Sequence, residues 1–571
     1  MSGRLKNWIK ASLGHNRRED QAFLVLTLLI GILVSVAVVG FIVLTERLGG
    51  RLFPTGGAGW RRLFIPVAGS LGVGYLLHRY APGARGNGVV QTKAALFVRG
   101  YRITLPAVLG KFFFTSATLA SGIPLGPEGP AVHVGAGIAS ILGREVGLSQ
   151  EKAKALIPVG AAAAIAAAFN APLAGVLFAL EELVGDLHAP MIGSVVLGAA
   201  TSWVVLRLLL GNEPIFRVPQ YEFVHPIEFG IYAILGVFGG IVSTIFCRSL
   251  VLLRACFKTL PRSTVWFQPL AGGLLVGIIG WFVPEVLGVG YGRVGDALNG
   301  QMALRLMAAL VALKLLTVVV AYASGNAGGL FAPSLFIGAM TGGAVGGVAH
   351  LLLPNQTATP GAYALVGMGA VFAGIIRAPM TSVIMIFEVT HDYAIIVPLM
   401  IANLMSFYIS RKGQPETLYE ELSLQDGIHL PVGRARVISG QFRVADVMRA
   451  PGEVFRDQDP VARVLEVTRA SRSRAWLVVD HQGIVGLISR ADLERAYSEG
   501  AGEKPLSEIL HDGFLPHVHE DQPLEVALQR LGQANLEMIP VVSRADVHEL
   551  MAVVTVNDIL DKYGIAPPQA D

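Results

Sequence analysis

Charge and cysteine are both scarce in this chain. Only 15% of its 571 residues are Asp, Glu, Lys or Arg, whereas 53% are hydrophobic. So little charge excludes an ordinary soluble globular protein of this length. The only two cysteines, Cys247 and Cys256, lack metal-ligand or disulfide spacing, so we expect them to be packing residues. The sequence also has no Walker loop, nucleophile–base pair or metal-ligand cluster, which gives no support for an enzyme, a required cofactor or a metal site.

The apolar segments are confined to the region between residue 21 and about residue 409. The first, 21–45, is long enough to cross a bilayer and has no small-residue cleavage site behind it, so we expect a retained helix. Basic residues precede this segment and predict a cytoplasmic N-terminus; they are Arg4, Lys6, Lys10, Arg17 and Arg18. The sequence therefore predicts an integral multi-pass membrane protein, and we expect it in the cell (inner) membrane.

Several later apolar segments are too short to span a hydrocarbon core of roughly 30 Å. Those at 131–142, 153–168 and 172–180 are separated by glycine and proline. Such patterns are typical of broken helices, which membranes tolerate only where the backbone lines a cavity or packs inside protein. We therefore expect an all-α polytopic fold with broken helices around a permeation pathway.

Two motifs recur in the same order along this region. GPEGPAVHVGA at 126–136 resembles GLFAPSLFIGA at 329–339, an offset of 203 residues. FNAPLAGVLFALEE at 169–182 resembles IRAPMTSVIMIFEV at 376–389, an offset of 207 residues. Two motifs nearly in register indicate a duplication, so we predict two structurally repeated halves. Whether the halves are inverted stays open at this point.

From residue 441 the sequence changes to short soluble α/β units that also occur twice. Strands are predicted at 475–479 and 539–542, each followed by a second strand and by a helix that begins at Ser489 or Thr555. We therefore divide the chain into an N-terminal segment (1–20), a transmembrane domain (21–420), a linker (421–440) and a soluble α/β region (441–571) with copies at about 441–500 and 504–565.

Three glycine-rich turns, at 86–89, 126–130 and 325–333, each precede an apolar helix. Unpaired backbone N–H groups at a helix N-terminus attract anions without a full positive charge, and weak donors permit both entry and exit. The alternative is that the glycines only allow close helix packing. Glu128 lies in the second turn, and a carboxylate in apolar sequence is a functional hypothesis by default. The alternative for Glu128 is that it caps its own helix.

The membrane region resembles the CLC family of chloride channels and proton-coupled chloride exchangers. The resemblance extends from about residue 63 to residue 419 and rests on the motifs GPEGP with His133, KLLT at 314–317, GGLFAP at 328–333, FNAPLAG at 169–175, and Tyr419. The soluble region resembles a pair of CBS domains. The family resemblance implies a homodimer in which each subunit has its own pore.

The resemblance also implies a role for each matching residue. It makes Glu128 the gating glutamate and outer proton carrier, and Glu182 the inner proton relay. The central anion would be bound by Asn87, Leu330, Phe331 and Tyr419. The turns that support this site contain Gly86, Gly88, Gly126, Gly129, Pro130, Gly328 and Gly329.

Glu182 bears on the choice between two mechanisms. Exchangers of the family usually keep a carboxylate here, whereas many passive channels have an apolar residue, so the resemblance favours antiport. The alternative is that Glu182 and its neighbour Glu181 only snorkel or pair at the end of their helix. Lys111 and Lys314 are expected to give electrostatic support through an acid or backbone carbonyls, and Glu388 is expected to be structural.

Two positions depart from the family pattern. Asn87 replaces the usual serine; its N–H could serve chloride or a planar oxyanion such as nitrate, but its carbonyl would repel an anion if the amide were reversed. Pro127 replaces the basic residue that commonly precedes the gating glutamate, which weakens the attraction of anions to the outer mouth.

In the soluble region, Ser489 with Asp492 and Thr555 with Asp558 match the CBS pattern in which a hydroxyl meets phosphate and the aspartate takes a ribose diol. We therefore predict an adenine nucleotide as a regulator, with helix N-capping as the alternative.

The sequence as a whole predicts proton-coupled anion antiport, with chloride and protons as substrates, lipid as surroundings and no nucleic acid. The alternatives are a voltage- or pH-gated passive chloride channel and a membrane-embedded nucleotide sensor whose transport is vestigial.

Overall fold

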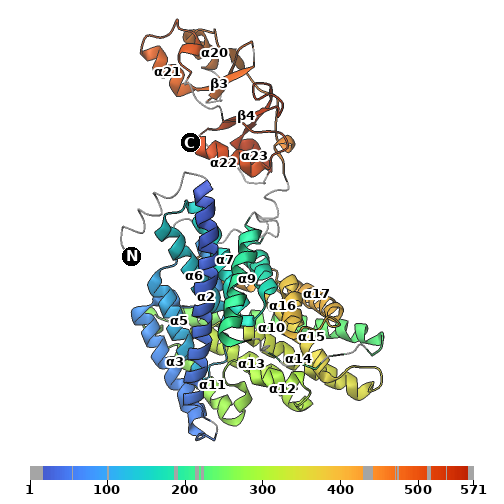
Figure 1. The fold of residues 1–571 in the computed structure, drawn as a ribbon. Helices are drawn as coiled ribbons and strands as arrows, with labels where there is room; N and C mark the ends of the chain where they lie inside the picture. Colours follow the sequence, from blue (N-terminus) through green and yellow to red (C-terminus); the bar gives the residue numbers. More distant parts are fainter. Residues whose placement is uncertain are drawn as a thin grey trace. The chain divides into compact units, whose positions relative to one another are not determined.

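The chain divides into two compact units, Met1–Leu430 and Pro431–Asp571. The first is built from helices and the second from small sheets with helices beside them (Figure 1). The computed structural model describes residues 17–54, 56–98, 102–185, 191–211, 216, 218–219, 221, 224–428, 442–469, 471, 475–481, 483–510, 516–534 and 536–562. Of the basic residues before the first helix, Arg4, Lys6 and Lys10 lie outside this set.

The first unit is helical throughout the described residues, as predicted. Its helices are α2 (Arg17–Leu52), α3 (Trp60–Tyr80), α4 (Val89–Phe97), α5 (Leu105–Ala120), α6 (Glu128–Val146), α7 (Gln150–Phe169), α8 (Pro172–Phe178), α9 (Ile192–Leu210), α10 (Ile227–Thr259), α11 (Pro269–Phe282), α12 (Tyr291–Leu298), α13 (Leu304–Ala323), α14 (Phe331–Leu352), α15 (Pro360–Ile376), α16 (Pro379–Thr390), α17 (Ile396–Gly413) and α18 (Leu418–Gln425).

The helices differ widely in length. In the described part of the chain, six are long and apolar enough to cross a membrane, and they lie in α2, α7, α9, α10, α13 and α14. Others are much shorter: α4 has 9 residues, α8 has 7 and α12 has 8. The expectation of an integral membrane protein with broken helices is confirmed.

The two predicted repeats contact each other directly. Gly126 and Gly329, which occupy equivalent positions, form an antiparallel bridge in which each amide donates to the other's carbonyl, at 2.9 and 2.6 Å. Asn170 and Arg377 are also equivalent, and both adopt a left-handed backbone with φ of 53° and 67° at the ends of α7 and α15. The duplication therefore extends to backbone conformation, and the pairing relates the halves by an approximate two-fold axis.

Two carboxylates from the second repeated motif cap each other's helices. Glu388 of α16 accepts the Leu173 and Ala174 amides at the start of α8, at 2.9 and 2.7 Å. Glu181, its equivalent, accepts the Met380 and Thr381 amides at the start of α16, at 3.2 and 2.8 Å. Both helices begin with proline and have no capping side chain of their own. Each half thus supplies the anion that the first turn of the other half requires.

The second unit contains two copies of a small α/β module. Strands β1 (Val454–Arg456), β2 (Ala475–Val479) and β3 (Ile484–Ser489) form one sheet, with β1 parallel and β3 antiparallel to β2. Strands β4 (Met538–Val542) and β5 (Leu550–Thr555) form the antiparallel second sheet. The helices are α20 (Val461–Thr468), α21 (Arg490–Ser498), α22 (Leu524–Ala534) and α23 (Val556–Lys562).

Two details differ from the expectations. The predicted linker over 421–440 begins inside packed structure, because α18 continues to Gln425 and Asp426 forms ion pairs with Arg254 and Lys258 of α10; residues 429–441 lie outside the described residues. Of the two cysteines, Cys247 is buried in the core but Cys256 is exposed, so the packing role expected for both applies to one.

The exchanged caps make a prediction about stability. We expect Glu388→Ala and Glu181→Ala each to lower the unfolding free energy of the detergent-solubilised protein by about 1–2 kcal/mol, the usual range for a lost cap. The midpoint of thermal unfolding should fall by similar amounts in both, whereas Glu145→Ala, at an exposed site on α6, should leave it unchanged. Equal midpoints in all three variants would show that the caps carry no stability.

Candidate functional site

The three glycine-rich turns meet at one place in the first unit. A Cβ atom on Gly88 would lie 2.4 Å from the carbonyl oxygen of Gly129, and one on Gly129 would lie 2.5 Å from the carbonyl oxygen of Asn87. The second turn is joined to the third by the Gly126–Gly329 bridge. Only glycine permits such close backbone approach, so these residues bring the N-termini of α4, α6 and α14 together.

The supporting residues of these turns are tightly packed. A Cβ atom on Gly328 would lie 2.4 Å from the Leu125 side chain, and one on Gly329 would lie 3.1 Å from Pro130. The Gly86 carbonyl accepts a 2.7 Å hydrogen bond from the Lys111 ammonium. These glycines therefore contribute to the geometry, because a Cβ atom at Gly88, Gly129 or Gly328 would overlap a neighbouring residue.

Glu128 is fully buried, and its carboxylate contacts the other repeat as well as its own backbone amide. Its Oε2 atom accepts the Ala332 amide in the first turn of α14 at 3.3 Å, and its Oε1 atom accepts the Tyr291 hydroxyl at the start of α12. No side-chain cap is present at the start of α6. The carboxylate of one repeat therefore occupies the positive end of the equivalent helix in the other repeat.

Asn87 is oriented by a hydrogen bond to its own helix. It is 1% exposed, and its carbonyl oxygen accepts the Val90 amide at 3.2 Å. The side-chain carbonyl of Asn87, which would repel an anion, therefore caps the start of α4. The Nδ2 donor is buried and has no hydrogen-bond partner among the described residues, which leaves it free for an anion.

Tyr419, Leu330 and Phe331 are also buried. The Tyr419 hydroxyl has no partner within the described part of the chain. Leu330 and Phe331 begin α14, ahead of its first intrahelical bond from the Ser334 amide to the Leu330 carbonyl, so their own amides are not consumed by the helix. The Phe331 ring packs edge-on against Phe178 at 5.1 Å. Unpaired buried donors are rare in folded proteins and call for an explanation.

Glu182 lies in a π-helical turn, Ala179–Val184, and forms a buried ion pair with Lys93 of α4. The Lys93 ammonium also lies 5.8 Å from the centre of the Tyr419 ring. Glu181 and Glu182 therefore do not act alike: Glu181 caps α16, whereas Glu182 faces a cation. Lys93 therefore lies between Glu182 and Tyr419, whose hydroxyl has no partner among the described residues.

The two expected support lysines bind backbone carbonyls. Lys111 donates to the carbonyls of Gly86 and Arg85 at 2.7 and 3.3 Å, and Lys314 donates to those of Gly288 and Val286 at 2.7 and 2.9 Å. Each lysine thus holds a glycine turn. An acid partner, the other option expected, is not found for either among the described residues.

Sequence reasoning missed Tyr291, Lys93 and Ala332. Tyr291 follows a further glycine-rich stretch, Gly-Val-Gly at 288–290, and a fourth glycine turn ahead of a helix was the available signal. Lys93 is the only charged residue between positions 86 and 98. Ala332 carries no side-chain signal, because it acts through its backbone amide.

In the second unit, the four predicted nucleotide residues form two matching helix caps. The Ser489 hydroxyl donates to Asp492 at 2.5 Å and accepts the Asp492 amide at 3.2 Å. The Thr555 hydroxyl donates to Asp558 at 2.6 Å and accepts the Asp558 amide at 3.2 Å. The two pairs occupy equivalent strand ends, and a nucleotide would have to exchange these hydrogen bonds for its own.

Two related helical halves, broken at the centre and joined through glycine turns that leave donors unpaired, define a class of membrane transport protein. The family model described as voltage gated chloride channel matches residues 69–411, and the CBS domain model matches residues 444–499 and 507–564. The chain therefore belongs to the voltage-gated chloride channel (CLC) family and carries a pair of CBS domains. The fold expected from the sequence is confirmed.

Named relatives and solved structures are similar to this chain. The H(+)/Cl(-) exchange transporter ClcA of Vibrio campbellii is 31% identical over 370 residues, which cover 63% of this chain and 78% of the relative. A slow cyanobacterial Cl-/H+ antiporter matches with a TM-score of 0.66 and 27% identity over 71% of this chain and 97% of the other. A eukaryotic CLC transporter has the same fold, with a TM-score of 0.64 and 20% identity over 94% of this chain and 97% of the other.

The unpaired donors make a prediction about binding. We expect Tyr419→Phe to weaken chloride binding about 2–10-fold, the effect of one hydrogen bond. Asn87→Asp keeps the acceptor for Val90 but replaces the donor with a second oxygen, so it should weaken binding more than Tyr419→Phe. Calorimetric titration of the purified protein with chloride measures both. Asn403→Asp is the control, because Asn403 is a buried amide with unpaired atoms that lies on α17, beside Gly369 of α15. Equal weakening in the control would contradict the assignment.

The Lys93–Glu182 pair makes a prediction about stability. Lys93→Met leaves a buried carboxylate without its cation, which costs about 3–5 kcal/mol of unfolding free energy. Lys93→Met combined with Glu182→Gln should recover most of that loss, and Lys93→Arg should retain the pair. A double-mutant cycle on unfolding midpoints measures the coupling. Additive effects of the two single changes would mean that the ion pair contributes nothing.

Proposed function

We propose that this chain is a proton-coupled anion antiporter that exchanges chloride for protons. The single observation that carries the proposal is the buried Glu128 carboxylate, held by the Ala332 amide at the N-terminus of α14 and by the Tyr291 hydroxyl. Neutral donors that bind a carboxylate can also bind a halide, because both are anions of similar hydrogen-bonding demand. Glu128 is thus a built-in competitor for the anion.

The proposed cycle follows from this competition. The ionised Glu128 side chain fills the outer anion position and closes the pathway. When it takes up a proton, its attraction to the amides of α14 falls and an anion replaces it. The unpaired donors of Asn87 and Tyr419, with the first-turn amides of Leu330 and Phe331, bind the central anion. They carry no full charge, so the anion can leave as readily as it enters.

Glu182 is the proposed inner proton carrier. Its ion pair with Lys93 keeps a carboxylate in the apolar interior, where an unpaired one would be too costly. Lys93 also lies against the Tyr419 ring, so we assign it the role of a positioning residue between the proton carrier and the central anion.

The relatives support this assignment. The Vibrio protein is named an exchange transporter for protons and chloride, and the cyanobacterial structure is that of a Cl-/H+ antiporter. A passive chloride channel is the alternative, and it differs in that no proton moves against its gradient. A vestigial pathway with nucleotide sensing as the main activity is disfavoured by the intact unpaired donors.

We further propose a homodimer in the cell (inner) membrane, with the N-terminus and the CBS pair in the cytoplasm and with domain boundaries near residue 20, after α18 and near residue 440. Ser489, Asp492, Thr555 and Asp558 are the proposed contacts for an adenine nucleotide, which would regulate transport and is not required for it.

Flux measurements in liposomes test the antiport. A chloride gradient should drive protons uphill in the wild type. Glu128→Gln or Glu182→Gln should reduce this proton movement to background, because a glutamine amide cannot take up and release a proton as a carboxylate does. Glu182→Gln should keep chloride flux, since the anion donors remain. Glu145→Gln, on the exposed face of α6, is the matched control. Chloride flux without proton movement in the wild type would identify a channel instead.

A further inference from the structure

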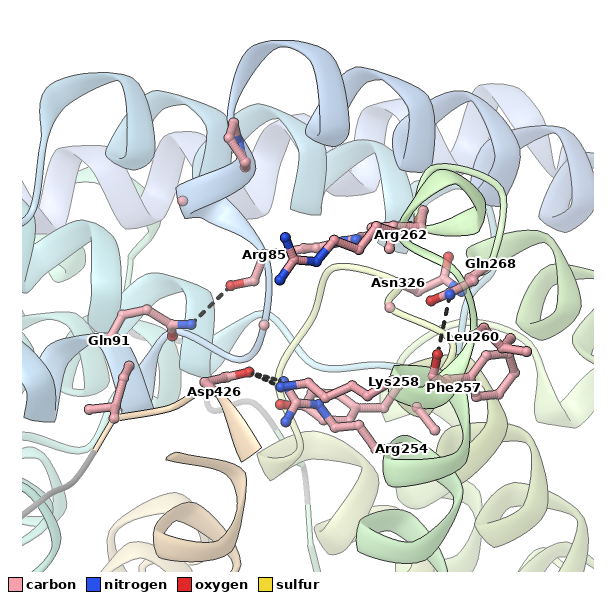
Figure 2. A pocket seen from close by; sticks show the side chains of 18 residues that line it. Arg85, Gln91, Arg254, Phe257, Lys258, Leu260, Arg262, Gln268, Asn326 and Asp426 are labelled. Atoms are coloured by element: carbon pink, nitrogen blue, oxygen red, sulfur yellow. Dashed lines mark hydrogen bonds and ion pairs between the residues drawn. The ribbon is translucent and has the colours of Figure 1, made fainter. Parts of the chain in front are cut away.

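A basic pocket of about 410 Å³ lies in the first unit, beside the turn that carries Asn87. It is formed by the segment before α4, the end of α10, the segment between α10 and α11, the turn after α13, and the residues after α18. Figure 2 shows Arg85 and Arg262 above the opening and Arg254 and Lys258 below it. Asp426 is the one acidic residue in the lining, so four cations face a single carboxylate.

Two of the cations are committed to that carboxylate. Asp426 accepts hydrogen bonds from Arg254 and from Lys258, both at 2.7 Å. Arg254 also donates to the Gln425 side chain at 2.9 Å. The single negative charge of Asp426 therefore neutralises only one of these two positive charges. The same contacts fix Arg254 and Lys258 at the lower side of the pocket.

The other two cations keep free donors. Arg85 donates from one terminal nitrogen to the Val265 carbonyl at 2.5 Å, but its buried Nε has no partner among the described residues. Arg262 is exposed, and its side chain forms no hydrogen bond or ion pair with another described residue. Two guanidinium groups from separate segments thus face the same opening with hydrogen-bonding capacity to spare.

We propose that this pocket binds a phosphate group. Guanidinium forks match the oxygens of phosphate in pairs, and Arg is favoured wherever an oxyanion is held by two parallel hydrogen bonds. Chloride has one charge and no pair of oxygens for a guanidinium group to bind. The pocket has an excess of three positive charges, which suits a multivalent anion. The volume is at the lower end of small-ligand sites, which fits a phosphate or pyrophosphate with water.

The pocket is next to the proposed anion pathway. Gly86 and Tyr322 line it; Gly86 precedes Asn87, and Tyr322 interacts with the Asn87 backbone. Occupancy by phosphate would hold this turn and place negative charge beside it, which slows the passage of chloride. The effect on chloride rests on the proposed function, but the binding does not.

The test uses the full-length protein and inorganic pyrophosphate as the probe. Calorimetric titration should show binding to the wild type that weakens at least about tenfold, or about 1.4 kcal/mol, in Arg85→Gln/Arg262→Gln. Asp426→Asn should strengthen binding, because it releases two cations, so the proposal predicts changes in both directions. Arg411→Gln, an exposed arginine in the last turn of α17 and outside the pocket, should bind as the wild type does.

Further arms identify the source of the phosphate and exclude the CBS pair. Pyrophosphate binding should persist in Asp492→Ala/Asp558→Ala; its loss there, or unchanged binding in Arg85→Gln/Arg262→Gln, overturns the proposal. In phosphatidylcholine vesicles, slowing of chloride flux by added pyrophosphate indicates a soluble ligand, whereas slowing by phosphatidic acid in the bilayer indicates a lipid headgroup. If pyrophosphate binds through Arg85 and Arg262 but the wild type carries no coupled flux, only the proposed function fails.

Discussion

Buried backbone donors need partners in an apolar interior, and the first unit meets this constraint by pairing its two halves. Breaking a helix inside a membrane protein exposes the amides of its first turn. Here the amides of α8 and α16 are taken by Glu388 and Glu181 of the opposite half, and Gly126 and Gly329 satisfy each other. Each half therefore supplies hydrogen-bond partners that the broken helices of the other half need, so the pairing of the two halves stabilises both.

The same pairing makes the exceptions informative. Buried polar groups are usually paired, and the unpaired Nδ2 of Asn87 and the unpaired hydroxyl of Tyr419 are two of several exceptions among the described residues, both on residues proposed to bind the anion. Their lack of partners does not reflect loose packing, because both residues are about 1% exposed and the turns around Asn87 are closed by glycine contacts. A rigid frame that leaves donors unpaired is preorganised for a ligand, since no protein contact has to be broken when the ligand binds.

Local patterns in the sequence identified what local chemistry determines. The glycine turns, the repeated motifs, Glu128 and the hydroxyl–aspartate caps of the CBS pair were all found in this way. The partners of the acids were not: Tyr291 is 163 residues from Glu128, Lys93 is 89 from Glu182, and Glu388 is 215 from Leu173. No periodic pattern in the sequence predicts contacts between residues so far apart along the chain. The orientation of Asn87 could not be predicted either, because it depends on whether the carbonyl or the amine finds the Val90 amide.

The surroundings of the two proposed proton carriers differ in a way that fits different tasks. Among the described residues Glu128 is held by neutral donors, backbone amides and a hydroxyl, which bind any small anion and so permit exchange with a halide. Glu182 is held by the full charge of Lys93, which favours the ionised carboxylate strongly. A gate must be displaced by the anion that it admits, whereas a proton relay must stay in place. The neutral cradle and the cationic partner therefore separate the two tasks on one scaffold, although both residues are buried glutamates.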